Sequence, residues 1–411
     1  MSELSERALA CLPEDRGLTQ EARARRAFLA HVMATSAEPA SARRHRRHLI
    51  TQYARAAPEA SATVSQAKNA LADNDLRAVD TLLPVTSYPW QREGFAYWSD
   101  LDAETAGARL VELLPDQSNT LRRYKPDERP VVFFFSGNRQ AYVGAEHEPA
   151  SGFFGQDLQA RASRYVAQCG QAVLRMLRQT PLRNAKLVMP VYGALQSRHE
   201  QRLIHFALSQ DPAFVHPSLL ETADALFEAL LAVCSQRGFR AVTHSYGSSA
   251  VVQCLTHLRE RAGAHNELAR YVAQGACIQF GGYRLHDLPG DWAPHHHCVL
   301  SPLDEIALGS AGTEPRYTSP LQWPEQMWSS CGLDALAALV RGDFERVPVS
   351  RTTIKPGVDL WCTALEGMRA YDAAGKPIAL LEKANGHFLS GYTEAATQRM
   401  PVLLEAFSQF Q

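Results

Sequence analysis

The chain has 411 residues, of which 45% are hydrophobic and 21% charged, and its formal net charge at pH 7 is −1. This composition is typical of a globular protein, and the near-zero charge gives no general attraction to nucleic acid or to an anionic membrane. The densest apolar run, Val131–Phe135, is far too short to cross a bilayer, so we expect no transmembrane segment.

The first 125 residues are rich in Ala, Arg, Glu and Ser and poor in β-branched runs. We expect residues 1–125 to form an N-terminal helical region and residues 126–411 to form an α/β catalytic domain. Two basic clusters, at residues 23–26 and 43–47, are interpreted as solvated helix faces balanced by acids. The alternatives are a face that binds phosphate or lipid headgroups, and a protein partner for this region.

Eight cysteines are scattered along the chain, and no two have CxxC spacing. Most lie in apolar runs, where a free cysteine behaves as a small buried hydrophobe, which favours a reducing compartment. The first residues contain acids and no sustained apolar core, unlike a secretory signal. We therefore expect a cytoplasmic protein, or one exported without a classical signal peptide.

From about Arg129 short apolar runs that end in turn residues alternate with helical patterns. One helix follows Pro217, where Ser218 and Glu221 have the spacing of a capping box. The predicted strands lie in RPVVFFFSGN, KLVMPVYG, GFRAVTHSYG, GACIQFGG and HHCVLSP. This alternation predicts a mainly parallel sheet with helices on both faces, whose reactive groups gather at the carboxyl ends of the strands.

The segment THSYG at residues 243–247 lies where a predicted strand meets a helix. This is the place of the nucleophile elbow, usually GxSxG, which projects a serine from a sharp strained turn. Gly247 meets the need for a small residue two positions after Ser245, whereas Thr243 replaces the first glycine. The alternative is an ordinary strand-to-helix turn with an N-capping serine.

A serine hydroxyl needs a neighbouring base to act as a nucleophile at neutral pH. In KPIALLEKANGHFLSGY, His387 lies in a glycine-containing loop after an apolar run, near the end of the chain. The order serine, acid, histidine is the one expected for an α/β-hydrolase. We therefore predict that His387 is the base of Ser245.

These motifs resemble the class 3 (fungal-type) triacylglycerol lipases of the α/β-hydrolase superfamily, over roughly residues 130–400. The resemblance lies in the order of the motifs rather than in continuous similarity. The matching segments are VVFFFSGN, VTHSYGSS, ACIQFGGYRLHD, CVLSPLDEIALG and NGHFLSGY. The chain departs from the family pattern at Thr243, at Ser248 in place of a second glycine, and in an acid loop without proline.

The resemblance implies an α/β-hydrolase fold and a triad of Ser245, His387 and Asp304. It also implies an oxyanion hole formed by the backbone N–H groups of Asn138 and Tyr246. In the implied mechanism His387 takes the Ser245 proton, Ser245 attacks an ester or thioester carbonyl, and water then releases the acyl group. The substrate would be a small-molecule or lipid ester, and no cofactor is implied.

The identity of the acid stays open among three residues. Asp304 follows an apolar strand and lies in the lipase-like LDEIALG segment. Glu366 and Asp372 follow the later strand in VDLWCTALEGMRAYD, where many other α/β-hydrolases place their acid. The local pattern favours Asp304, whose alternative role is to cap the turn after its strand.

The triplet of His295, His296 and His297 raises the question of a metal site. Alternate residues of a strand share a face, so at most His295 and His297 could bind one ion, and the sequence offers no third ligand. We therefore expect no metal. For the function as a whole, the alternatives to an esterase or lipase are an acyltransferase or thioesterase on the same triad and a non-catalytic binding module of the same fold.

Overall fold

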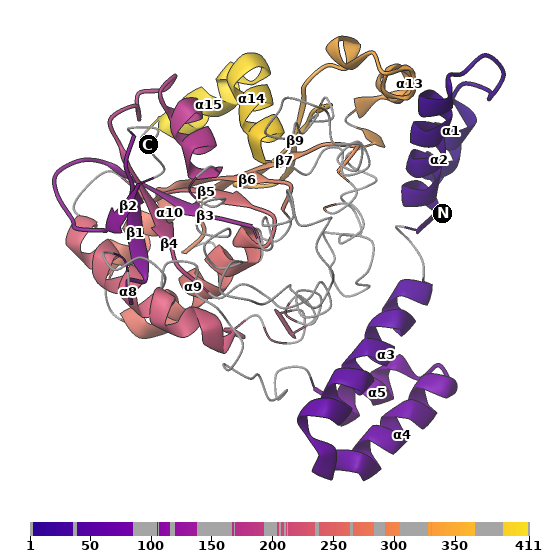
Figure 1. Ribbon diagram of the computed structural model, residues 1–411, viewed down its shortest axis with the longest axis horizontal. Helices are drawn as coiled ribbons and strands as arrows, with labels where there is room; N and C mark the ends of the chain where they lie inside the picture. The colour runs from indigo at the N-terminus through magenta and orange to yellow at the C-terminus, as the bar shows by residue number, and fades with distance from the viewer. Residues whose placement is uncertain are drawn as a thin grey trace.

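The computed structural model describes residues 3–35, 39–84, 105, 107–115, 120–137, 167, 169–192, 204, 207–208, 211, 213–234, 238–263, 266–282, 292–304, 307, 328–329, 331–365 and 389–409. Within these residues the strands form one sheet of nine, in the order β2-β1-β4-β3-β5-β6-β7-β9-β8 (Figure 1). The strands are β1 (Leu110–Leu113), β2 (Leu121–Arg123), β3 (Val131–Phe135), β4 (Lys186–Pro190), β5 (Arg240–His244), β6 (Ala276–Phe280), β7 (His295–Leu300), β8 (Ser350–Lys355) and β9 (Val358–Cys362).

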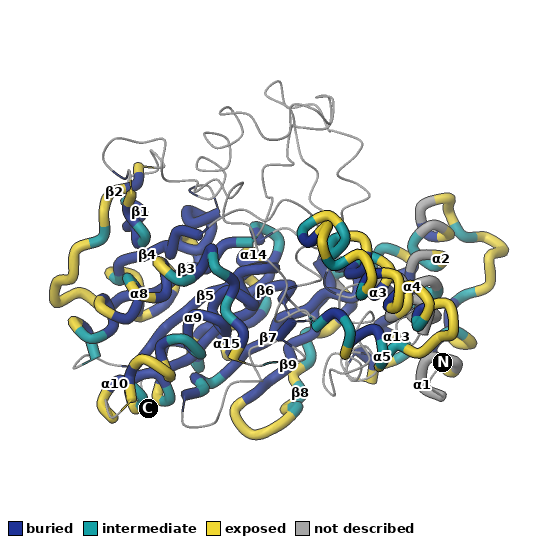
Figure 2. Tube along the Cα trace, turned by 90° about the horizontal axis from the view of Figure 1, so that it is seen from below, coloured by how far each residue is buried: buried dark blue, intermediate teal, exposed yellow. Residues whose placement is uncertain are grey.

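The six strands from β4 to β9 in the sheet order pair in parallel, and antiparallel strands complete both edges. The central strands are buried on both sides along almost their whole length (Figure 2). Runs such as VVFFF suit this position, because a parallel strand between two helical layers has no solvent-facing side. The five predicted strands are confirmed, as is the later strand in VDLWC, which is β9, whereas β1, β2 and β8 were not predicted.

Helices cover both faces of the sheet (Figure 1). On one face α8 (Pro217–Val233), α9 (Gly247–Ala262) and α10 (Asn266–Ala273) share a core with β3 and β5. On the other face α14 (Leu389–Arg399) and α15 (Pro401–Ser408) pack on β6 and β7. The prediction of a mainly parallel sheet covered on both faces by helices is confirmed.

The N-terminal part of the chain is helical, as predicted, and its helices form two groups. Its helices are α1 (Glu3–Ala10), α2 (Gln20–Thr35), α3 (Pro39–Ala56), α4 (Ser61–Ala72) and α5 (Leu76–Leu82). The first two pack on α13 (Leu333–Arg341), where Ala8 and Leu29 lie in one apolar cluster with Leu336 and Leu360. Helices α3, α4 and α5 pack against one another.

The expected boundary between residues 125 and 126 is wrong, because β1 and β2 precede it and belong to the sheet. Strand β1 pairs with β4 through Leu110 to Leu113, and β2 pairs with β1. Both strands are short, and they carry Glu112, Arg122 and Arg123. Charged residues in three- or four-residue strands hide the alternation that identifies an edge strand.

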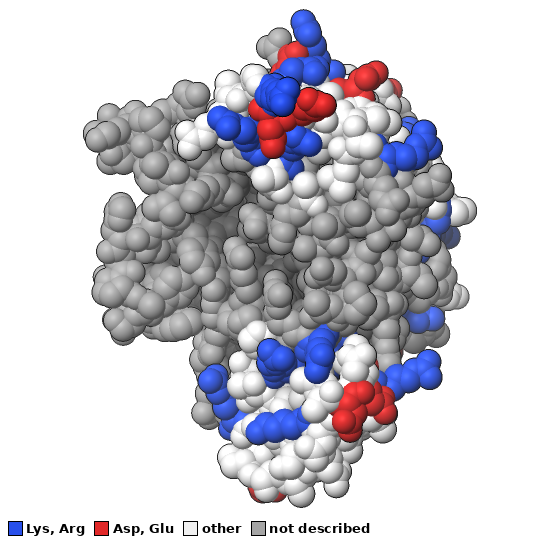
Figure 3. All heavy atoms as spheres, turned by 90° about the vertical axis from the view of Figure 1, so that its right-hand side faces the viewer, with Lys and Arg blue, Asp and Glu red and all other residues white. Residues whose placement is uncertain are grey.

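The basic clusters of the N-terminal helices are used in different ways. Arg26 pairs with Asp15 at 2.7 Å, as a balanced surface would require, and Arg25 lies over the Phe344 ring. Arg46, by contrast, is buried and forms a two-pronged ion pair with Asp80 that joins α3 to α5, so the prediction is wrong for this residue. Arg43 and Arg47 of the same cluster are exposed, as predicted. Figure 3 shows Asp and Glu among the Lys and Arg at the top of this side of the molecule, and a group of Lys and Arg with an acidic cluster at its border near the bottom.

Two cysteines contradict the expectation of free thiols. Cys331, just before α13, and Cys362, at the end of β9, form a disulfide, whereas the other six are not part of a disulfide. The two residues are 31 positions apart, and only the packing of α13 beside β9 brings their Cα atoms to 6.5 Å. None of the helices among the described residues combines the length and apolarity needed to cross a membrane.

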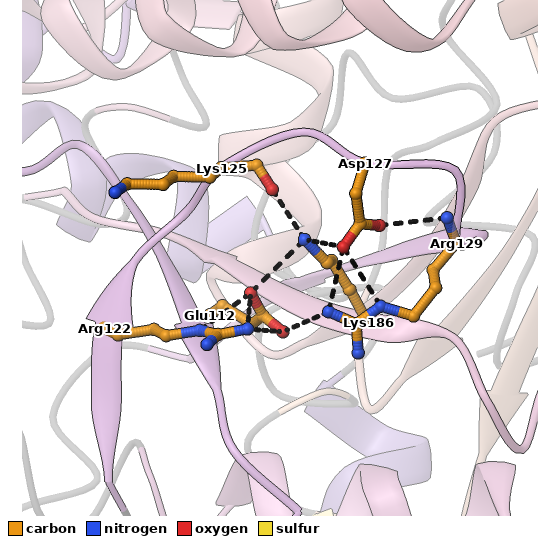
Figure 4. A network of polar contacts seen from close by, with 6 residues as sticks. All are labelled: Glu112, Arg122, Lys125, Asp127, Arg129 and Lys186. Atoms are coloured by element: carbon orange, nitrogen blue, oxygen red, sulfur yellow. Dashed lines mark hydrogen bonds and ion pairs between the residues drawn. The ribbon is translucent and has the colours of Figure 1, made fainter.

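A charge network, in which Lys186 and Glu112 are buried, joins β1 to β4 near one edge of the sheet (Figure 4). Lys186, on β4, is 3% exposed, and its Nζ lies 2.7 Å from Asp127 and 3.6 Å from Glu112. It also donates to the Lys125 carbonyl, at 2.6 Å. Arg129 contacts the same two acids from the solvent side. Lys186 on β4 therefore compensates the charges of Glu112 on β1 and of Asp127 in the loop after β2, and so joins three segments of the chain.

Burial raises the pKa of Asp127, but hydrogen bonds from Lys186 and Arg129 outweigh burial, and the pKa lies well below its ordinary value of 3.8. A carboxyl with a depressed pKa stabilises the fold at pH values above its unfolded pKa, and this contribution is lost as the pH falls through the folded pKa. The network should therefore be intact at neutral pH and weaken below about pH 4.

We expect Lys186→Met to lower the free energy of unfolding by about 1–3 kcal/mol, because Glu112 and Asp127 lose the buried ammonium between them while Glu112 keeps its two-pronged contact with Arg122. Urea denaturation of the full chain measures this. The matched control is Lys125→Met, since Lys125 contributes only its backbone carbonyl and should change stability by less than about 0.5 kcal/mol. Equal stability of the two variants would contradict a structural role for the buried amine.

Candidate active site

Ser245 lies in the turn between β5 and α9, at the carboxyl end of the central strand of the sheet. Its φ is +51°, which among the described non-glycine residues is matched only by Asn74 at +59°. Residues other than glycine rarely adopt this left-handed backbone conformation, and one that does is strained by about 1–3 kcal/mol. The serine is 8% exposed. A strained serine in a strand-to-helix turn is the geometry of a nucleophile elbow.

Gly247 explains why the turn is so tight. A Cβ at this position would lie 2.0 Å from the carbonyl oxygen of Phe135 and 2.8 Å from that of Ser136. Both atoms belong to the backbone at the end of β3, so they cannot move aside as a flexible side chain would. The prediction that a small residue is needed two positions after the serine is confirmed.

Thr243, which stands in place of the usual first glycine, is accommodated by a partner. Its Oγ1 lies 3.0 Å from the Oγ of Ser248, the residue that replaces the second glycine. Both side chains are buried, at 0% and 1% exposure. Gly282 makes room for the pair, because a Cβ there would lie 1.9 Å from Ser248 Oγ. The two departures from the family pattern therefore form one hydrogen-bonded unit.

The turn lies where the strand order of the sheet changes direction. From β3 the chain continues to β4 on one side, and β5, on the other side of β3, leads on to β6 and β7. In open α/β sheets, ligands bind in the crevice at the carboxyl ends of strands at such a point. Ser136, directly after β3, and Ser245, directly after β5, are on its two sides.

Tyr192 contacts the residues that follow both of these strands. Its hydroxyl donates a hydrogen bond to the Ser136 carbonyl, and its ring packs edge-on against Tyr246, with centroids 6.1 Å apart. Burial raises the pKa of the Tyr192 hydroxyl far above its ordinary value, so it remains a donor. The segment after β3 and the first residue after Ser245 are thus held by one side chain.

Asp304 follows β7 and is fully buried. Its Oδ1 accepts the backbone N–H of Ala307 at 2.8 Å, and its Oδ2 accepts the Tyr392 hydroxyl at 2.6 Å. Burial, and then the nearby carboxylate, raise the pKa of Tyr392 well above its ordinary value. Each carboxylate oxygen has two lone pairs, so both can accept another hydrogen bond. The carboxylate is oriented by these two contacts.

Several predicted residues lie outside the described part of the chain. They are Asn138, His387, Glu366 and Asp372. The candidate acids still differ in how far the strands that precede them lie from β5. Strand β7 is two strands from β5, or about 10 Å, whereas β9, which precedes Glu366 and Asp372, is three strands away, or about 14 Å. The shorter span suits an imidazole that hydrogen-bonds a serine at one end and a carboxylate at the other.

The histidine triplet behaves as its strand position predicts, and the structure adds a third group. His295 and His297 lie on one face of β7, and Asp359 of β9 lies beside them. The sequence did not indicate this aspartate as a ligand, because it lies 62 positions after His297 inside an otherwise apolar strand, VDLWC. This group is at the amino ends of the strands, away from Ser245.

Comparison with protein-family models, with curated proteins and with solved structures finds no match for this chain. The site is therefore interpreted from its own geometry. Two of its residues carried no signal in the sequence. Tyr192 is 56 positions from its partner Ser136, and Tyr392 is 88 positions from Asp304.

We expect a double-mutant cycle of Thr243→Val and Ser248→Ala to give a coupling energy of about 1 kcal/mol. Each single change leaves the other buried hydroxyl without its partner, at a cost of about 1–3 kcal/mol, while the double change removes both hydroxyls. Chemical denaturation of the four proteins measures it. Thr243→Ser, which keeps the hydroxyl, is the control, and strict additivity of the single changes would contradict the pairing.

Proposed function

We propose that this chain is a serine hydrolase of the α/β-hydrolase fold that cleaves carboxylic or lipid esters through an acyl-enzyme on Ser245. One observation carries the proposal: Ser245 has a φ of +51° at the end of the central strand, directly before a helix that begins at Gly247. Backbone strain of this kind persists only where the surrounding structure enforces it, and it concentrates at functional sites.

The helix after Ser245 supplies the electrostatics of the proposed reaction. The first N–H groups of a helix have no intrahelical acceptor and carry partial positive charge. The backbone N–H of Tyr246 would form half of an oxyanion hole, and that of Asn138, two residues after Ser136, would form the other half. Donors fixed before the reaction stabilise the tetrahedral intermediate without reorganising, and each is worth a factor of about 10²–10³ in turnover.

His387 would act as the base and Asp304 as the acid. The histidine would take the proton of Ser245 Oγ as the oxygen attacks the acyl carbonyl, and then give it to the departing alcohol. Asp304 would hold the imidazole in its productive tautomer and stabilise the imidazolium. Its fixed orientation by Ala307 and Tyr392 and its place two strands from Ser245 both support this role. No cofactor takes part in this chemistry.

We expect Ser245→Ala to abolish turnover of short p-nitrophenyl esters and covalent labelling by a fluorophosphonate, because the side chain that forms the acyl-enzyme is gone. The melting temperature should change little, since the substitution removes one hydroxyl and leaves the backbone of the turn in place. Ser408→Ala, which removes a buried serine hydroxyl on α15, should keep turnover and labelling. Labelling that survives in Ser245→Ala, or that never occurs in the unmodified chain, contradicts the proposal.

We expect Asp304→Asn to lower turnover by a factor of about 100 or more while Ser245 remains in place, because an amide cannot hold the imidazolium as a carboxylate does. Steady-state kinetics with the same esters measure this. Glu366→Gln and Asp372→Asn are the matched controls and should each cost far less. If one of these controls abolishes turnover and Asp304→Asn does not, the acid follows β9 instead of β7.

A further inference from the structure

A second cluster of reactive side chains lies at the amino ends of the strands. His295 and His297 project from β7 on the same face, and their rings are 4.6 Å apart between centroids. Asp359 of β9 is the register partner of His297, and neighbouring partners in a parallel sheet point to the same side. The three residues each offer one ligand atom, and these atoms lie within 4.8 Å of one another.

The two separations that involve Asp359 are close to those around a four-coordinate metal. His295 Nε2 is 2.9 Å and His297 Nδ1 is 3.6 Å from Asp359 Oδ2. Bonds of about 2.0–2.1 Å in a tetrahedron place neighbouring ligand atoms about 3.3 Å apart, between the two values. The three groups therefore need only small rotations to share one ion.

Neighbouring groups hold the ligands in suitable states. Thr353 donates a hydrogen bond to Asp359 Oδ1 at 2.8 Å, which leaves Oδ2 toward the histidines. Trp361 Nε1 donates weakly to His297 Nδ1 at 3.4 Å, so this nitrogen carries a lone pair, and a bound ion would replace the tryptophan N–H as its partner.

A cavity of about 120 Å³ adjoins both histidines and leaves room for water at a fourth coordination position. Arg351 also lines it and is the main competitor for the carboxylate, because its guanidinium lies 2.9 Å from Asp359 Oδ2. This arginine is 46% exposed and lies over the Trp361 ring, so it can turn toward solvent. The buried Arg240 lines the far wall and donates to backbone carbonyls, among them that of Gln409.

We propose that His295, His297 and Asp359 form a binding site for one divalent transition metal, with zinc the best match to two imidazoles and one carboxylate. The site is distinct from the proposed esterase site and does not depend on it. His295 begins β7 whereas Asp304 follows its end, so the two sites are roughly 20 Å apart across the sheet. The ion would join β7 to β9 and stabilise the fold without taking part in acyl transfer.

Calorimetric titration of the chelator-treated full chain with zinc chloride tests this site, with the visible absorption of bound Co²⁺ as a second measure. We expect His295→Ala, which alters a partly exposed side chain, to weaken zinc binding at least tenfold and to remove the tetrahedral Co²⁺ bands. Arg351→Gln should strengthen zinc binding at least threefold, because it removes the cation that competes for Asp359.

The matched control is His257→Ala. His257 lies 3.0 Å from Asp224, which also binds an arginine, Arg261, so the trio reproduces the ion pairs of the proposed site without a second histidine. Its removal should leave zinc binding unchanged. Zinc affinity that is the same in His295→Ala as in the unmodified chain overturns the proposal.

The proposal is equally overturned if Arg351→Gln weakens zinc binding, or if inorganic phosphate binds the unmodified chain and Arg351→Gln abolishes that binding. The latter result would make the cavity an anion site built on its arginines. The sign of the Arg351→Gln effect thus separates the two ligand classes.

Discussion

The packing of the first turn of α9 against the end of β3 is the contact on which the candidate active site depends. Gly247 lies so close to the carbonyl oxygens of Phe135 and Ser136 that a single methyl group would collide with both. Because the helix must begin this near the sheet, the chain leaves β5 through a left-handed residue, Ser245. The same contact places the residue after the serine beside the segment that follows β3.

Around this contact, hydrogen bonds between distant residues hold the parts in place. Thr243 and Ser248 satisfy each other inside the turn, and Tyr192 links Ser136 to the ring of Tyr246. On the neighbouring side Tyr392, from α14, holds the carboxylate of Asp304. Buried hydroxyls are costly when they lack partners, so these pairs fix positions as well as add stability. The strain at Ser245 is offset by a scaffold whose strands are buried on both faces.

Strand β7 positions residues of both candidate sites, one at each of its ends. Its first residues place His295 and His297 beside Asp359, and its last residue leads into the turn that carries Asp304. Side chains alternate along a strand, so His296 points to the opposite face from its two neighbours. A strand in the middle of a parallel sheet is rigid along its length. The two groups are therefore held at a fixed separation by the same backbone.

The local sequence pattern was sufficient to predict a strand wherever burial on both faces demanded a continuous apolar run, as in Val131–Phe135. It failed at the edges, where β1, β2 and β8 are short or carry charges. It also failed at the start of α8, where Ser218 and Glu221 have the spacing of a capping box. There the N-cap is His216, whose Nδ1 accepts the Ser218 N–H, and burial lowers the pKa of this imidazole to about 3, which keeps it an acceptor.

The sequence by itself determined the alternation of strands and helices, the strand-to-helix turn at Ser245 and the need for Gly247, because these depend on neighbours within a few residues. Only the tertiary structure decided the order of the strands, the partners of Thr243 and Asp304, and the arrival of Asp359 beside two histidines 62 and 64 positions away. Such contacts depend on which strands become neighbours in the sheet. That is settled by the burial of all the apolar faces together, and no short segment contains it.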